Sequence, residues 1–399
     1  GKTNVTTYAY DRLGKQVYEY IDSTGLAIIT RSAYDSFGRM TSKTDANGVV
    51  TSFSYDRAHN LLVATRDGKS DTYTYDKLGN AITRKDRNGN TTTYAYTAFN
   101  RQLTVTTAEG ATSITRQNAF GEVTWSQDAR GAVSVQNYDT NGRLTSTVQA
   151  QGSLNLTASN VYDTGGRLTQ TTDARGTVTK YVYDDANRLT QRIVDQAGLN
   201  LVTSYAYDTE GRVIQTTDPE GRVTNTTFDA LGRVLSIIVD PAGLAIETRF
   251  AYPDKQVTEI THAFGTAEAR LTRHTYDRAG RLVQTQVDPS GLNLVTQYAY
   301  DKAGNVVRKT DAAGYVTRYA YDANGQLAYE VDALLGVTRF EYDGLGHIVA
   351  QTRYAIPIAL LPAEESVALT TAVIAGKLVA NAQQDRATRT AYDRDGRLR

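Results

Sequence analysis

Several residue types are scarce in this sequence, and each shortage excludes a class of structure. The 399 residues include no cysteine, one tryptophan, one methionine and six prolines. Without cysteine, neither disulfides nor thiolate-bound metals can hold the fold. The four histidines lack metal-ligand spacing, and there is no His-Glu-x-x-His, nucleophile-elbow or phosphate-loop motif. We therefore expect no enzymatic activity, no cofactor and no metal.

Net charge and long apolar runs are also absent. The chain carries 43 basic and 43 acidic side chains. A nucleic-acid partner calls for a basic face, so we expect none. No apolar run approaches the roughly 20 residues that cross a bilayer, so we expect no membrane insertion by this segment. No signal peptide opens the chain, and both ends cut through a repeat, so we expect a piece of a longer protein.

Tyrosine and glycine are abundant, with 27 and 32 copies. Tyrosine favours pleated, half-buried surfaces, and glycine favours turns. Both recur in the motif Tyr-Asp-x-x-Gly-Arg, whose four defined positions we call the Tyr, Asp, Gly and Arg slots. The clearest copies are Tyr34, Asp35, Gly38 and Arg39; Tyr162, Asp163, Gly166 and Arg167; Tyr207, Asp208, Gly211 and Arg212; and Tyr276, Asp277, Gly280 and Arg281.

Seventeen repeats follow from this motif, and we name each by the number of its Tyr slot. The Tyr slots are 10, 34, 55, 75, 96, 117, 138, 162, 183, 207, 228, 252, 276, 300, 321, 342 and 392. Most intervals are 21 or 24 residues, with one of 20 and one of 50. A fixed period of this length indicates a repeat architecture. Alternating residues such as Thr93-Tyr94-Ala95-Tyr96 indicate strands.

Each repeat contains two turn signals. The Gly slot should hold a left-handed backbone, which asparagine also tolerates, and we expect this of Asn60, Asn100 and Asn187. A second Asp-x-x-Gly signal lies halfway through most repeats, where glycine should again take a positive φ. Examples are Asp45–Gly48, Asp173–Gly176, Asp218–Gly221, Asp240–Gly243, Asp288–Gly291 and Asp311–Gly314. These signals predict an all-β fold, a tandem ribbon of β-hairpins.

The motif side chains have a structural interpretation and a functional one. Tyrosines at positions i and i+2 should share one face and stack across neighbouring repeats as an aromatic ladder. The same rings could instead bind sugars, but scaffold repeats normally have this appearance. The Arg slot could form a basic stripe, yet the neutral net charge favours pairing with neighbouring acidic groups. We therefore expect the repeat residues to be structural.

The 50-residue interval predicts a different element. Residues 357 to 384 are rich in alanine, and Val367, Ile374 and Leu378 have helical spacing. Pro362 suits a first helical turn, and the two glutamates that follow suit a helix N-terminus. We expect one inserted α-helix. The predicted organisation is a hairpin array over residues 1–353, a helical insertion over 354–388, and the start of the next repeat over 389–399.

The Tyr-Asp-x-x-Gly-Arg repeats resemble the YD repeats of the Rhs family, shared with Tc toxin B and C components, wall-associated YD proteins and teneurins. The resemblance covers the chain except for the insertion. It implies that the ribbon forms part of a spiralling, hollow shell. In bacterial relatives the shell encloses a C-terminal toxin, often released by self-cleavage. In teneurins a similar shell is part of an adhesion receptor.

The resemblance predicts a structural segment of a large exported bacterial Rhs protein, secreted or at the cell surface. Its partners would be the remainder of the same chain and an enclosed C-terminal toxin. The alternative is a cell-surface adhesion or carbohydrate-binding protein, with glycans as partners. Asp240-Pro241-Ala242-Gly243-Leu244 and the similar segment at Asp288 resemble the element near the Rhs self-cleavage site. Because Asp195 opens the same pattern in another long repeat, we interpret these segments as turns.

Overall fold

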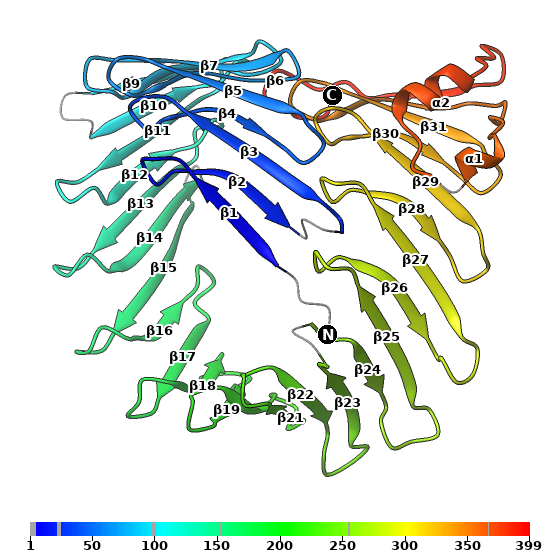
Figure 1. Ribbon diagram of the computed structural model, residues 1–399. Helices are drawn as coiled ribbons and strands as arrows, with labels where there is room; N and C mark the ends of the chain where they lie inside the picture. Colours follow the sequence, from blue (N-terminus) through cyan, green and yellow to red (C-terminus); the bar gives the residue numbers. More distant parts are fainter. Residues whose placement is uncertain (1–4, 22–24, 98–100, 152–153, 254–255, 366) are drawn as a thin grey trace. The chain divides into compact units, whose positions relative to one another are not determined.

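The computed structural model describes residues 5–21, 25–97, 101–151, 154–253, 256–365 and 367–399. Within those residues it contains 33 β-strands in one antiparallel sheet and two short helices (Figure 1). Strands that follow one another in the chain pair as hairpins, as β15, β16 and β17 do. The predicted all-β ribbon of tandem hairpins is confirmed.

The first strands are β1 (Thr6–Tyr10), β2 (Gln16–Ile21), β3 (Ile28–Tyr34), β4 (Met40–Thr44), β5 (Val50–Tyr55), β6 (Leu61–Arg66), β7 (Lys69–Tyr75), β8 (Ala81–Lys85), β9 (Thr91–Tyr96), β10 (Gln102–Thr106), β11 (Thr112–Gln117), β12 (Val123–Gln127), β13 (Val133–Tyr138), β14 (Leu144–Gln151), β15 (Leu154–Tyr162) and β16 (Leu168–Thr172). The remaining strands are β17 (Val178–Tyr183), β18 (Leu189–Val194), β19 (Leu201–Tyr207), β20 (Val213–Thr217), β21 (Val223–Phe228), β22 (Val234–Val239), β23 (Ile246–Ala251), β24 (Glu259–His262), β25 (Arg270–Tyr276), β26 (Leu282–Val287), β27 (Leu294–Tyr300), β28 (Val306–Thr310), β29 (Val316–Tyr321), β30 (Leu327–Val331), β31 (Val337–Tyr342), β32 (Ile348–Arg353) and β33 (Arg386–Arg389).

The chain divides into two compact parts. The first comprises Gly1–Thr93, Thr107–Glu109 and Thr272–Arg399. The second comprises Tyr94–Thr106 and Gly110–Leu271. The first part therefore brings together repeats that are far apart in the sequence.

Repeat 162 shows how the motif forms a hairpin turn. The amide of Gly166 donates to the Asp163 carbonyl, and the amide of Asp163 donates to the Arg167 carbonyl. The strand register shifts between Val161 and Tyr162, which marks a β-bulge beside the turn. Gly166 has a φ of +88°, a left-handed conformation that glycine adopts without steric cost. A type I turn followed by a glycine bulge produces this arrangement.

Asparagine in the Gly slot is confirmed in one of the three expected places. Asn187 has a φ of +63°, and Asn100 lies outside the described residues. The assignment of Asn60 was wrong, because the Gly slot of repeat 55 is His59, with a φ of +71°. Asn60 stands in the Arg slot, where its amide nitrogen donates to Asp56 Oδ2. Histidine, like asparagine, is enriched among non-glycine residues with positive φ.

The mid-repeat turns take two forms, of which the sequence predicted one. Gly48, Gly176, Gly221 and Gly314 have φ between +81° and +86°, as expected. In repeats 183, 228 and 276, which are 24 residues long, it is instead Asp195, Asp240 and Asp288 that have positive φ, from +52° to +53°. Gly243 is needed for another reason: a Cβ at this position would collide with Asp240 Oδ2. The aspartate carboxylate thus fills the space above the glycine.

The insertion contains two short helices and not the single helix that we expected. These are α1 (Pro362–Glu365) and α2 (Thr371–Lys377). Thr370 has an extended backbone and caps α2 by accepting from the Val373 amide, so it separates the two helices. Val367, which we counted on a helical face, is 51% exposed. The ribbon resumes at β33, which pairs with β32 from Arg386 onward, three residues before the predicted boundary.

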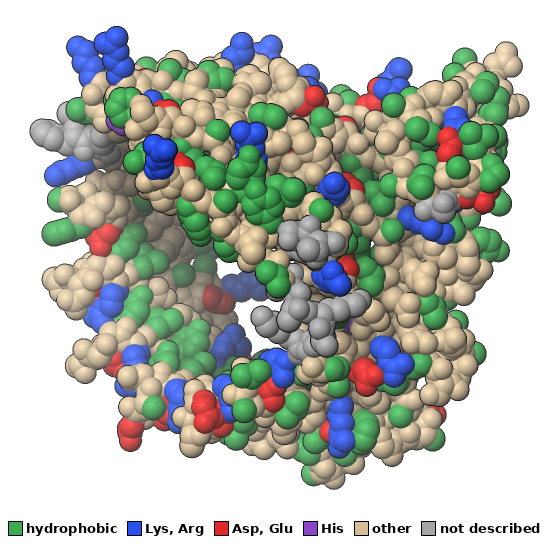
Figure 2. Space-filling view, viewed as in Figure 1, with side chains coloured by type: hydrophobic (Ala, Val, Ile, Leu, Met, Phe, Trp, Pro, Cys, Tyr) green, Lys and Arg blue, Asp and Glu red, His purple; other side chains and the backbone are tan. Residues whose placement is uncertain are grey.

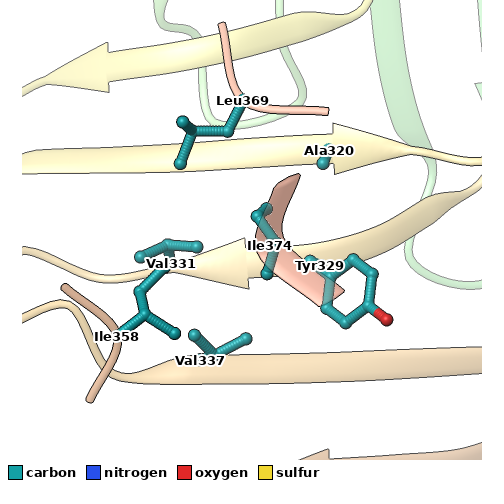
Figure 3. Packing of buried hydrophobic residues seen from close by; sticks show 7 residues of the cluster. All are labelled: Ala320, Tyr329, Val331, Val337, Ile358, Leu369 and Ile374. Carbon is teal, nitrogen blue, oxygen red and sulfur yellow. The ribbon is translucent and has the colours of Figure 1, made fainter. Parts of the chain in front are cut away.

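The insertion provides the main apolar core of the described residues (Figure 3). Ile358, Leu369 and Ile374 pack on side chains of β29, β30 and β31, among them Val331 and Val337. Leucine and isoleucine from irregular segments thus dock on the sheet beside the helix, which explains why helical spacing was misleading. In the second compact part no described apolar side chain is fully buried. Its hairpins must therefore be held together by other contacts.

Candidate functional site: clasps between neighbouring repeats

The aspartate of each turn organises the backbone around it. In repeat 276, Asp277 Oδ1 accepts from the amides of Ala279 and Arg281, each at 2.9 Å. Its other oxygen accepts from Arg281 Nε at 2.7 Å. In repeat 162, hydrogen bonds from the Arg167 side chain and backbone hold the pKa of Asp163 below its ordinary value. The carboxylate is therefore committed to the turn.

The arginine then reaches the following repeat. Arg281 Nη1 donates to the Asp301 carbonyl at 2.7 Å, and its guanidinium lies 4.8 Å from the centre of the Tyr300 ring. The Tyr300 hydroxyl donates back to the Leu282 carbonyl at 2.6 Å. Two neighbouring repeats are thus joined by an ion-paired arginine, an aromatic ring and two hydrogen bonds to backbone. We call this arrangement the clasp.

The clasp recurs along the chain. An Arg-slot guanidinium lies over the next Tyr-slot ring, at 4.5 to 5.2 Å, for Arg39, Arg143, Arg167, Arg188, Arg212, Arg233 and Arg281. A Tyr-slot hydroxyl donates to the preceding repeat at Tyr34, Tyr55, Tyr75, Tyr138, Tyr162, Tyr183, Tyr207, Tyr300, Tyr321 and Tyr342. In repeats 34, 162, 207 and 276 the arginine lies over the next Tyr-slot ring, and Tyr34, Tyr162 and Tyr207 also donate to the preceding repeat. Tyr276 instead lies beside His274, with the ring centres 6.4 Å apart.

The ring-on-ring ladder that we expected is wrong. Among the described residues, no two Tyr-slot rings of neighbouring repeats stack on each other. Equivalent strands of neighbouring repeats are two strand spacings apart, roughly 9.6 Å, which exceeds the range of ring pairs. A guanidinium fits in that gap. The sequence signal for this was the arginine itself, which we had paired only with acidic groups.

Asp240 and Asp288 share their geometry with the other long turns. Their Oδ2 atoms accept from the amides of Leu244 at 3.1 Å and Leu292 at 2.7 Å. Asp195 accepts from Leu199 in the same way, at 2.8 Å. The described residues contain no group of three or more metal-ligating side chains. No helix in that portion of the chain is long and apolar enough to span a bilayer.

Within the first compact part, turns of early repeats touch turns of late repeats. Asn47 Nδ2 donates to Asp301 Oδ2 at 3.0 Å, and Arg66 Nη2 donates to the Ala323 carbonyl at 3.1 Å. Asn88 Oδ1 accepts from the Gly344 amide. The hydroxyl of Thr107 donates to Asp395 Oδ2 at 2.8 Å. We call these the seam contacts.

The seam contacts have a constant offset. Each joins a mid-repeat turn of repeat 34, 55, 75 or 96 to the Tyr-Asp turn of repeat 300, 321, 342 or 392. In chain order these are the second to fifth repeats and the fourteenth to seventeenth. The ribbon therefore meets itself twelve repeats further on. The insertion does not disturb this offset, because β32 and β33 pair directly across it.

The surface shows mixed charge. Lys and Arg side chains lie among Asp and Glu side chains on the face in Figure 2, without a large area of one sign. Turn leucines and phenylalanines, such as Leu78, Phe120 and Leu231, are largely exposed. Charge of both signs on a repetitive surface is consistent with the neutral composition.

Comparisons with known proteins agree with the repeat assignment. The RHS Repeat family matches residues 34–72, 75–112 and 300–334, and the Teneurin YD-shell family matches residues 119–243. No curated protein sequence matches this chain.

Solved structures share the fold. The crystal structure of TcdB2-TccC3-TEV aligns with a TM-score of 0.59 at 14% identity, over 99% of this chain and 23% of that one. That of TcdB2-TccC3-Cdc42 gives 0.57 at 14% identity, over 98% and 23%. The Photorhabdus luminescens Tc holotoxin pore gives 0.58 at 14% identity, over 98% and 23%. This chain thus spans less than a quarter of the length of those chains.

Proposed function

Because this chain belongs to the Rhs/YD-repeat family, we propose that it is a wall segment of a larger shell and that the shell encloses a C-terminal toxin. The observation that carries the proposal is the seam, where the ribbon meets itself after twelve repeats. A strip that touches itself at a constant offset can build a continuous wall. The fold shared with Tc toxin proteins supports this role.

The clasps support a mechanical role for the motif residues. The same contact of an arginine with an aromatic ring, tyrosine in six cases and Phe228 in one, joins hairpin to hairpin in seven places, so stability is distributed along the ribbon. Sequential pairing also uses up the strand edges, which would otherwise recruit other chains. We propose that Tyr34, Asp35, Gly38 and Arg39, and their equivalents in repeats 162, 207 and 276, serve the wall and not a ligand.

We further propose that this segment performs no catalysis. The shared hydrogen bond from the leucine amide gives Asp240 and Asp288 the same turn role as Asp195. Incubation of the purified segment followed by mass spectrometry tests this point. A defined cut at Asp240 or Asp288 would refute it.

The shell and its cargo are tested on the native parent protein, which we propose is exported by a bacterium. Intact-mass measurement and terminal sequencing should find a separately cleaved C-terminal polypeptide that stays bound to the repeats. That polypeptide should resist added protease until the repeats are unfolded.

An uncleaved chain ending in a surface anchor would favour adhesion instead. Specific binding of the purified segment to a glycan array would point to the same alternative, in which the wall itself recognises sugars.

A further inference from the structure

Repeat 117 departs from the motif at three of its four positions. Gln117 replaces tyrosine, Asn118 replaces aspartate and Glu122 replaces arginine. The turn still forms: Asn118 Oδ1 accepts from the amides of Phe120 and Glu122, at 2.9 and 3.1 Å. Its amide nitrogen donates to Glu122 Oε2 at 2.5 Å. The fold is thus kept while the charge in the Arg slot is inverted.

The inverted charge lies where other repeats place a guanidinium. In repeat 138, Arg143 extends over the next turn. If Gly166 carried a Cβ, that atom would lie 3.3 Å from Arg143 Nη1. At the equivalent point of repeat 117, Glu122 Oε1 would lie 2.6 Å from a Cβ on Gly142. Elsewhere Arg Nη1 donates to the next Asp-slot carbonyl, as Arg143 does to Asp163 at 3.4 Å. The corresponding carbonyl next to repeat 117 is that of Asp139. The side chain near it is the Glu122 carboxylate, which cannot donate as an arginine does.

An open cavity of about 590 Å³ lies at this place, between the turns that precede β12 and follow β13. Glu122, Gln136, Tyr138 and Asp139 line it. The exposed ring of Phe120 stands at the rim. The cavity therefore combines the Glu122 carboxylate with the ring of Tyr138.

The remaining charges do not neutralise Glu122. The Asp139 carboxylate is paired with Arg143 Nε at 2.7 Å. No Lys or Arg in the described part of the chain forms an ion pair with Glu122. A carboxylate beside an aromatic ring matches a planar cation with several N–H donors.

We propose that this cavity binds the guanidinium group of an arginine side chain presented by another polypeptide segment. The incoming arginine would pair with Glu122, lie over Tyr138 and donate to the Asp139 carbonyl, as Arg143 does to the Asp163 carbonyl. It would thereby complete in trans the clasp that seven other repeats make in cis. This inference does not depend on the identity of any cargo.

The test uses N-acetyl-arginine amide as the probe and saturation-transfer NMR on the whole chain. N-acetyl-citrulline amide is the matched neutral probe, since it keeps the shape and loses the charge. The arginine compound should bind and the citrulline compound should bind about tenfold or more weakly, because charge-assisted hydrogen bonds are lost. Glu122→Gln should weaken arginine binding by a similar factor, whereas Glu220→Gln, an exposed turn residue of the same compact part, should leave it unchanged.

Glu122→Arg provides an independent readout. It restores the Arg slot within the chain, so it should abolish binding of the probe and raise the thermal midpoint of unfolding. Equal binding of the two probes, or binding unaffected by Glu122→Gln, would overturn the proposal. A folded Glu122→Arg variant that still binds the arginine probe would do the same.

Discussion

At the residue scale, the clasp explains why the motif ends in arginine. Arg281 offers Nε to Asp277, Nη1 to the Asp301 carbonyl and its flat face to Tyr300. Lysine has one compact charged group and cannot make these three contacts together. Arg281 is also well protected, with 17% of its side chain exposed, so the solvent screens this pair less than a surface ion pair.

A double-mutant cycle on Arg281 and Tyr300 measures the contact. We expect Arg281→Lys to lower the free energy of unfolding by about 1 kcal/mol, since a hydrogen bond to a charged group and a ring contact are lost. Urea unfolding of Arg281→Lys, Tyr300→Leu and the double variant should show a coupling energy of about 0.5–1 kcal/mol. Strictly additive single effects would mean that the ring and the guanidinium do not interact.

Backbone strain at the Gly slot gives a second residue-scale prediction. Gly166→Ala places a Cβ at a φ of +88° and should cost about 1–2 kcal/mol. Gly166→Asn should cost less, because Asn187 holds the same slot one repeat later at +63°. Thermal unfolding monitored by circular dichroism compares the variants.

The neighbouring Gly165 is the matched control, because its backbone does not have a positive φ. Gly165→Ala should leave the thermal midpoint almost unchanged or raise it slightly. Equal losses at 165 and 166 would show that the space around the turn, and not the left-handed backbone, requires glycine.

At the element scale, the turns depend on ionised aspartate. The pKa of Asp163 lies below its ordinary value of 3.8 because Arg167 donates to the carboxylate, first through its side chain and then through its backbone amide. A lowered pKa in the folded state stabilises the fold above the unfolded value, and this contribution is lost as pH falls through the folded value. The thermal midpoint should therefore be flat near neutrality and fall below about pH 4.

Asp163→Asn isolates the contribution of one turn. Asparagine retains the acceptor that orders the backbone, as Asn118 does in repeat 117, but it carries no charge. The variant should be less stable than the parent at neutral pH and show a shallower acid decline. A decline as steep as that of the parent would place the acid sensitivity elsewhere in the chain.

The sequence predicted the turns and hairpins because their causes are local. Gly166 and Asn187 each signal a left-handed backbone from inside the six-residue motif that forms the turn. Strand pairing then follows from the spacing of the turns. The insertion misled because Ile358 and Leu369 pack on the sheet from segments without helix, a tertiary effect that no spacing rule contains. The clasp was missed because Arg281 and Tyr300 belong to different repeats and meet only when β26 pairs with β27.

At the scale of the whole molecule, the seam raises the question of what sets an offset of twelve repeats. The seam contacts are few, polar and at turn tips, where single hydrogen bonds contribute about 1 kcal/mol each. The twist between paired strands, by contrast, is repeated in every hairpin. We therefore expect hairpin geometry to set the offset and the seam contacts to follow it.

Deleting one whole repeat distinguishes these causes. Removing residues 163–183 joins Tyr162 to Asp184 and regenerates the motif, with Asn187 in the Gly slot. Because the chain has no cysteine, the pair Asn47→Cys and Ala303→Cys can report the native seam through a short thiol cross-linker. Asn47→Cys with Asn324→Cys reports contact one repeat later. In the intact chain only the first pair should cross-link, with single-cysteine variants as controls.

If hairpin geometry sets the offset, the deletion should reduce cross-linking between 47 and 303 and create it between 47 and 324. Persistence of the 47–303 cross-link would instead show that the seam residues select each other and that the hairpins adjust to them.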